Sequence, residues 1–173
     1  MQEPTDLATG HDFYANPRLS PDGNRLAWLQ WDHPNMPWDG CELQVATLDA
    51  SGVPFSVESV AGGIDESICQ PEWAPDGRLY FVSDRTGWWN LYRHSGSAVD
   101  QVVSIDAEMG RPMWVFDNNG YAILDNQTAV TDLLRAGRSR LHTIDLESGA
   151  LSEVETPYTS FACLLYTSPS PRD

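Results

Sequence analysis

The sequence has 173 residues, of which 41% are hydrophobic and 10% aromatic, and this composition predicts a globular domain and excludes a disordered chain. Ten basic against twenty-five acidic residues give a formal net charge of -15. Such a surface repels phosphate backbones and anionic lipids, so we expect neither a nucleic acid nor a membrane as partner. Because the sequence contains no long apolar stretch and no leader-like start, we expect a cytoplasmic protein. Three cysteines without CxxC spacing predict neither a disulfide framework nor a zinc site.

A hairpin motif occurs twice in the first half of the chain. NPRLSPDGNRLAWLQW (16–31) and QPEWAPDGRLYFVSDR (70–85) each place a Pro-Asp-Gly turn before an apolar run. Pro presets the first turn dihedral, Asp bonds its own backbone and Gly adopts a positive φ, so the chain reverses between two short strands. Strand alternation in the first copy puts Trp28 and Gln30 on one face and Ala27 and Leu29 on the other. Both faces are largely apolar, which predicts a sheet packed on two sides.

A weaker third copy, RPMWVFDNNGYAILDN (111–126), has an Asp-Asn-Asn-Gly sequence where the turn is expected. A second hairpin signal follows each copy, at 42–52, 83–93 and 140–154. Four short strands in each unit of roughly 40 to 55 residues are typical of propeller blades. We therefore predict an all-β fold, a partial β-propeller of about three four-stranded antiparallel blades near residues 10–62, 63–109 and 110–162.

Two runs resemble a known family. GHDFYANPRLSPDGNRLAWLQWDHPNMPWDG (10–40) and ESICQPEWAPDGRLYFVSDRTGWWNLYR (66–93) are similar to the N-terminal β-propeller of prolyl oligopeptidase family serine peptidases, in the acylaminoacyl-peptidase or dipeptidyl-aminopeptidase-like branch. TolB-like and other WD40-like propellers share the SPDG hairpin, but DHPNMPWDG and SDRTGWWNLYR make the resemblance specific. It implies a propeller that covers a C-terminal α/β-hydrolase domain and selects peptide substrates by size, without a cofactor.

The 173 residues contain no G-x-S-x-G pentapeptide, the turn that presents a nucleophilic serine in α/β-hydrolases. The family's Ser, Asp and His therefore have no counterparts here, and we expect no catalytic residue in this chain. Asp32, Asp117 and Asn126 are too scattered to predict a metal site. The leading hypothesis is a fragment of a substrate-gating propeller whose peptide hydrolysis resides in a domain outside these residues. The alternative is a stand-alone TolB-like propeller that acts as a protein-binding module.

The candidate binding residues lie in a loop with two prolines, 32–40. Stiff loops with aromatic side chains often bind partners. We predict that Asp32, His33, Trp38 and Asp39 line the substrate cavity or contact the hydrolase domain, with Trp38 as an apolar wall and a carboxylate that meets a peptide amine. The alternative is an interstrand loop packed by its own Trp and Pro side chains.

The sequence also predicts the surroundings of several other side chains. Of Trp88 and Trp89, one is expected to pack in the core and one to face outward. Asp84 and Arg85 are expected to form a local ion pair. Three histidines are expected to be satisfied polar side chains and not ligands: His11, His94 and His142. Asp65 and Glu66 are expected to be a solvated pair.

The two ends of the sequence bear on whether the propeller is whole and where it stops. The family has blades upstream of the GHDFY segment, whereas nine residues precede Gly10 here. About three isolated blades expose apolar sheet faces on both flanks, so we expect self-association. The final segment, CLLYTSPSPRD (163–173), breaks the strand rhythm and resembles a translated sequencing adapter, so we assign residues 1–162 to the propeller and treat 163–173 as a non-native tail. The alternative for this tail is a native interblade loop.

Overall fold

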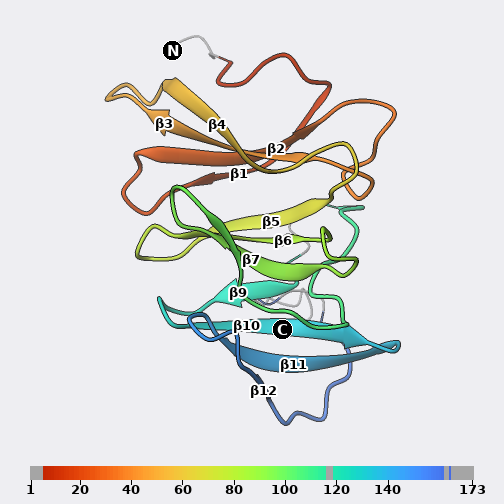
Figure 1. The fold of residues 1–173 in the computed structure, drawn as a ribbon. Coiled ribbons are helices and arrows are strands. Elements are labelled where there is room, and N and C mark those ends of the chain that lie inside the picture. The colour runs from red at the N-terminus through yellow and green to blue at the C-terminus, as the bar shows by residue number, and fades with distance from the viewer. Residues whose placement is uncertain (1–5, 116–118, 162–163, 165–173) are drawn as a thin grey trace, which may run out of the picture.

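The computed structural model describes residues 6–115, 119–161 and 164. In these ranges twelve strands form three four-stranded antiparallel sheets that stack on one another (Figure 1). The prediction of an all-β partial propeller is confirmed. Neighbours in each sheet follow chain order, and the strands are β1 (Phe13–Leu19), β2 (Arg25–Trp31), β3 (Glu42–Leu48), β4 (Pro54–Gly62), β5 (Ile68–Trp73), β6 (Leu79–Ser83), β7 (Asn90–His94), β8 (Val99–Gln101), β9 (Tyr121–Ile123), β10 (Thr128–Arg135), β11 (Arg138–Asp145) and β12 (Leu151–Glu153). We call the sheets β1–β4, β5–β8 and β9–β12 blades 1, 2 and 3.

The turn between β1 and β2 is held by the side chain of Asp22. Its Oδ1 accepts hydrogen bonds from Ser20 Oγ (2.6 Å) and from the Asn24 backbone N–H (3.1 Å). Gly23 supplies the positive φ of 72° that the turn requires. These contacts, that from Ser20 first, lower the pKa of Asp22 to about 2. The predicted Pro-Asp-Gly hairpin therefore forms as expected.

We expect an Asp22→Asn variant to lose less thermal stability than the wild type between about pH 4 and pH 2. The folded-state pKa lies below the ordinary value of 3.8. The stabilisation from this carboxylate is therefore present above that ordinary value and disappears as the pH falls through the folded-state pKa. Thermal midpoints measured across this range would check the prediction. Ser20→Ala, which removes the largest cause of the shift, should show part of the same effect; identical acid profiles for all three proteins would contradict it.

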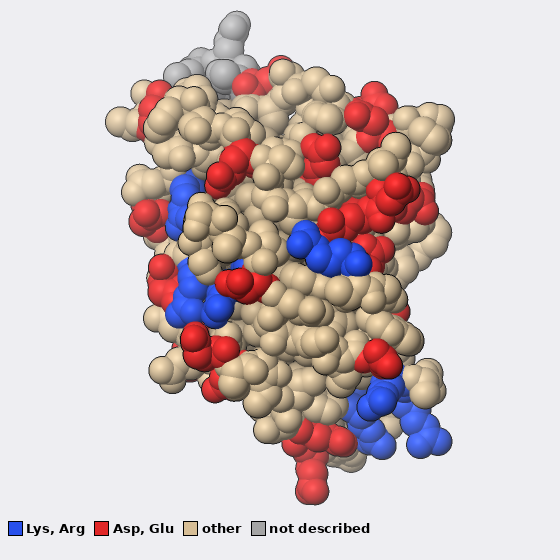
Figure 2. All heavy atoms as spheres, viewed as in Figure 1, with Lys and Arg blue, Asp and Glu red and all other residues tan. Residues whose placement is uncertain are grey.

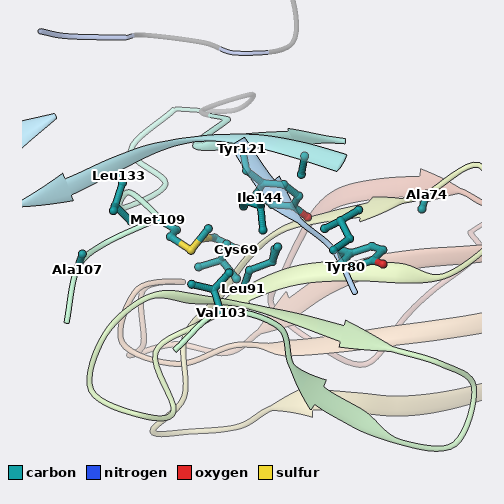
Figure 3. Close-up of a cluster of buried hydrophobic side chains, with 13 residues drawn as sticks. Cys69, Ala74, Tyr80, Leu91, Val103, Ala107, Met109, Tyr121, Leu133 and Ile144 are labelled. Carbon is teal, nitrogen blue, oxygen red and sulfur yellow. The ribbon is translucent and has the colours of Figure 1, made fainter. Parts of the chain in front are cut away.

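The two blade interfaces form the core. Blade 2 is buried on both faces, because its strands direct alternate side chains to opposite neighbours. Phe81 and Tyr92 pack toward blade 1 with Leu29 and Leu43. Figure 3 shows the other interface, where side chains of blade 2 meet those of blade 3, among them Cys69, Tyr80, Leu91, Tyr121 and Ile144.

The alternation predicted in β2 is confirmed. Trp28 Nε1 donates to Gln30 Oε1 at 3.0 Å, so these two side chains share one face. Ala27 and Leu29 lie on the other face, within the cluster shared with blade 2.

The third hairpin copy was placed wrongly by the sequence pattern. The expected turn at 117–120 precedes β9, and residues 116–118 lie outside the described residues. The turn that joins β9 to β10 comes after Tyr121–Ile123, where Asp125 Oδ1 accepts the backbone N–H groups of Gln127 (2.8 Å) and Thr128 (2.7 Å). An Asx turn and the cross-strand pairing with β10 thus decide the register, and Tyr-Ala-Ile is the first strand of its blade instead of the second.

The first strands of successive blades are tied together by side chains. β5 is bulged at Gln70, whose φ is 49°, and the buried Gln70 side chain reaches blade 3. There Oε1 accepts from Gly120 N (2.8 Å) and Nε2 donates to Tyr121 O (2.6 Å), while the Tyr121 hydroxyl donates to Gln70 O (2.8 Å). Toward blade 1, Trp73 Nε1 donates to Arg18 O at 2.9 Å.

The expected local ion pair between Asp84 and Arg85 is wrong, and so is the expectation that Glu66 is merely solvated. Arg85 Nη2 pairs with Glu66 Oε1 at 2.8 Å, and Ser83 Oγ donates to the same oxygen. Asp84 instead accepts the Ser67 N–H at 2.8 Å. The loop folds back on the blade connection, so a partner distant in sequence replaces the adjacent one.

The two tryptophans after this loop behave as predicted: Trp89 packs against the core shared with blade 3, and Trp88 is exposed. The described residues include no helix long and apolar enough to cross a membrane. The assignment of the tail falls on residues outside the described ones, apart from Leu164.

Candidate functional site

The loops at one end of the three blades are long and contact one another. They join β2 to β3 (32–40), β4 to β5 (63–67), β6 to β7 (84–89) and β8 to β9 (102–120). Asn35 Nδ2 donates to Ile64 O at 2.9 Å, and Ser67 Oγ donates to Pro37 O at 2.9 Å. We call this the long-loop end, and it also carries the tight β10–β11 hairpin, because Glu108 of the 102–120 loop pairs with Leu134 there. The opposite end carries the other hairpin turns.

Two of the predicted residues, Asp32 and His33, line a pocket of about 170 Å³ at this end. Asp32 accepts the Asp12 N–H (2.9 Å) and contacts His11 Nδ1 (3.0 Å). The backbone bond from Asp12 is the main reason that the pKa of Asp32 is lowered. Asp12 in turn accepts the His33 N–H at 3.0 Å. The pocket therefore presents a carboxylate beside an imidazole.

The sequence missed His11, which appeared isolated because its partner lies 21 positions away. The pairing of β1 with β2, Phe13 opposite Trp31, is what brings His11 next to Asp32. Only a correct prediction of that register would have revealed the contact.

The other two predicted residues lie elsewhere in the loop. Asp39 Oδ2 accepts the Met36 N–H at 2.9 Å and so holds the turn of its own loop. Trp38 is half-buried against Trp114, with ring centroids 4.1 Å apart and an interplanar angle of 42°. The structure thus brings Asp32 and His33 together in one pocket but leaves Trp38 and Asp39 out of that pocket.

The loops of the long-loop end, which carry the Trp38–Trp114 pair, expose several large apolar side chains, and we call these the Trp38–Trp114 patch. Trp114 is 74% exposed, and Met36, Ile64 and Val115 are also exposed. Large apolar side chains of this kind, gathered on loops that bond one another, are characteristic of surfaces that contact a partner. Trp114 lies in the third predicted hairpin copy, 111–126, whose pattern implies a strand before the expected turn, and so it was not predicted as an exposed residue.

The chemistry of the long-loop end favours binding. The thiols of Cys41 and Cys69 are buried, and burial raises the pKa of each to about 12, so neither is a thiolate nucleophile. Within the described ranges, no three His, Cys, Asp or Glu side chains come together as metal ligands. What remains is a pocket that presents a carboxylate and an imidazole, next to exposed apolar side chains, an arrangement suited to peptides and protein surfaces.

Comparison with solved structures identifies relatives of this chain. A puromycin hydrolase is 40% identical with a TM-score of 0.82 over 88% of this chain and 23% of its own. A puromycin-hydrolyzing peptidase from Mycobacterium tuberculosis is 36% identical, with a TM-score of 0.83 over 91% of this chain and 24% of its own. The present chain therefore spans about a quarter of the length of these relatives. Scans of protein-family models and of curated proteins gave no match.

More distant structures share the fold alone. Prolyl oligopeptidase B from Galerina marginata is 12% identical, with a TM-score of 0.61 over 85% of this chain and 20% of its own. TolB from Acinetobacter baumannii is 19% identical, with a TM-score of 0.55 over 79% of this chain and 31% of its own. Three four-stranded blades, the two specific sequence runs and the identity of 36–40% agree. The chain belongs to the prolyl oligopeptidase family, as part of its β-propeller.

Proposed function

We propose that this chain is part of the substrate-gating propeller of a serine peptidase whose α/β-hydrolase domain is encoded by the same gene. The observation that carries the proposal is the identity of 36–40% to a puromycin hydrolase and a puromycin-hydrolyzing peptidase across 88–91% of the chain. A TolB-like binding module is not favoured, since a solved TolB and a solved putative TolB are only 19% and 18% identical to this chain. Hydrolysis of a peptide-like amide such as that of puromycin is the expected activity of the whole protein.

The long-loop end is the surface through which we expect this gating to act. The Asp32 pocket offers a carboxylate for a peptide amine, and the Trp38–Trp114 patch offers apolar area for the hydrolase domain. The stiff 32–40 loop is bonded to its neighbours, so it presents both features in fixed positions.

The experiment that tests the proposal is to sequence the source locus past both ends of the chain. A reading frame that continues into G-x-S-x-G, followed by Asp and His, supports it, and the encoded protein should then release the amino acid of puromycin. Replacing the Ser of that pentapeptide by Ala should abolish the release. A locus that encodes CLLYTSPSPRD and stops there would overturn both the proposal and the adapter interpretation.

In that encoded protein, we expect Trp114→Ala to lower kcat/KM for peptide substrates by about tenfold while it changes the unfolding free energy by less than about 1 kcal/mol. The side chain is mostly exposed in this chain, so its loss removes contact area for a partner and little core packing. Phe55→Ala is the control, because Phe55 is 68% exposed on β4, the outer strand of its blade. Equal kcat/KM values for Trp114→Ala and Phe55→Ala would show that the patch plays no part in catalysis.

A further inference from the structure

The arginines of this chain are distributed unevenly. All ten basic residues are arginines, and three of them, Arg135, Arg138 and Arg140, lie on the hairpin between β10 and β11. Figure 2 shows this group as the blue atoms that project at the lower right, at the end of blade 3. In a chain of net charge -15, such a concentration of positive charge is a distinct local feature.

Two of these arginines have no acidic partner within the described residues. Ion pairs there hold Arg18, Arg78, Arg85, Arg93 and Arg111. On the hairpin, only Arg140 is paired, with Glu153 at a long 3.7 Å. Arg135 and Arg138 are exposed and have no ion pair in the described ranges. Their guanidinium groups are therefore available to an external anion.

The hairpin borders a cavity of about 470 Å³. Its apolar part consists of Ile105, Leu133, Ala136 and Leu151, and Ile105 comes from the segment that follows β8. The basic part consists of Arg135, Arg138, Arg140 and His142, with Glu153 as the acidic member. All of these lining residues belong to the described part of the chain, on blade 3 and on the segment that follows β8.

The short outer strand of blade 2 explains why this cavity is open. β8 has three residues, whereas the corresponding strand of blade 1, β4, has nine. After β8 the chain leaves the sheet, and Ile105 is its one contribution to the lining among the described residues. The faces of β11 and β12 that are directed at blade 2 are therefore not covered near the arginines.

We propose that this cavity is a docking site for an acidic peptide segment, one that carries a carboxylate side chain next to an aliphatic one. Planar guanidinium groups bind carboxylates in a bidentate manner, and bonds of this kind are stronger than those between neutral groups. Leu133, Leu151 and Ile105 provide an apolar surface that a simple inorganic anion cannot use. The site lies on blade 3, away from the Asp32 pocket on blade 1, and the proposal does not depend on the peptidase function.

Binding of blocked peptides to the protein as its gene encodes it tests the proposal. Acetyl-Leu-Glu-Leu-Glu-amide is the probe, acetyl-Leu-Gln-Leu-Gln-amide is its neutral match, and inorganic phosphate is the simple anion. Isothermal titration calorimetry should give a Kd for the acidic peptide at least about tenfold tighter than for the other two. This affinity should weaken as salt rises from about 50 to about 300 mM, because salt screens exposed charges.

The double variant Arg135→Gln/Arg138→Gln should weaken the acidic peptide by about tenfold or more, which corresponds to about 1.4 kcal/mol. Both side chains are exposed, so the variant should keep the thermal midpoint of the wild type. Arg78→Gln is the control, because Arg78 lies outside the cavity lining and pairs with Asp76. Equal binding of the Glu and Gln peptides, equal affinity for phosphate, or unchanged binding by the double variant would each overturn the proposal.

Discussion

Replacing Phe81 by alanine is expected to lower the free energy of unfolding by about 3–5 kcal/mol. Phe81 lies at the centre of β6 in the middle blade, is fully buried, and stacks on Tyr92 with ring centroids 6.0 Å apart. The expected loss has two parts. The free energy gained by removing an aromatic ring from water is lost, and a cavity remains between two sheets that cannot move together to fill it. A loss of this size is a large fraction of the stability of an ordinary domain.

Urea unfolding followed by fluorescence and circular dichroism measures the change. Phe55→Ala is a matched control, since Phe55 is 68% exposed, and it should alter the unfolding free energy by no more than about 0.5 kcal/mol. Phe81→Leu keeps most of the apolar volume and should cost less than the alanine variant. If Phe81→Ala and Phe55→Ala had the same midpoint, the packing of blade 1 against blade 2 in this structure would be wrong.

The second large effect is expected from Gln70→Glu, which should destabilise the protein by about 3–5 kcal/mol at neutral pH. Gln70 is 3% exposed, and its Nε2 donates to the backbone carbonyl of Tyr121 at 2.6 Å. A glutamate there keeps the shape and the bond from Gly120 N, but it turns the donor into a buried negative charge that faces a carbonyl oxygen. One of the four hydrogen bonds that join Gln70 to Gly120 and Tyr121 is then lost.

The pH dependence distinguishes this cause from a mere change of packing. Burial raises the pKa of the new carboxyl above its usual value of about 4.3. Because the folded-state pKa is raised, the penalty is smallest below about pH 4 and grows as the pH rises above that value. Unfolding free energies of the variant and the wild type, compared between about pH 4 and pH 7, should therefore diverge. Gln101→Glu, at an exposed position in β8, is the control; a loss independent of pH in Gln70→Glu would contradict the explanation.

Local chemistry allowed much of the fold to be predicted from the sequence. Pro-Asp-Gly favours the turns at Pro21 and Pro75 through backbone dihedrals and through side-chain bonds between residues two positions apart. Alternation in β2 indicated a sheet that is apolar on both faces, and β2 and β6 are buried on both faces. The family resemblance followed from two runs whose loops are specific, and the comparisons confirmed it.

The contacts that form the candidate site were decided by the tertiary structure. His11 meets Asp32, Glu66 meets Arg85 and Trp38 meets Trp114, and each pair is separated by many positions in the sequence. Strand register and blade stacking place these residues together, and neither can be predicted from the residue types of a short segment. The register of blade 3 shows the same limit, because Asp-Asn-Asn-Gly has the composition of a hairpin turn but the pairing of β9 with β10 puts the turn at Asp125.

The sequence by itself therefore determined the Pro-Asp-Gly turns with the strands beside them, the all-β class and the family, since these depend on interactions within a few residues. Only the tertiary structure decided which charges are paired, where the aromatic patch is exposed and why the arginines of the β10–β11 hairpin remain available. The physical reason is that pairing and burial depend on the distances between segments, and those distances are set when the blades pack against one another.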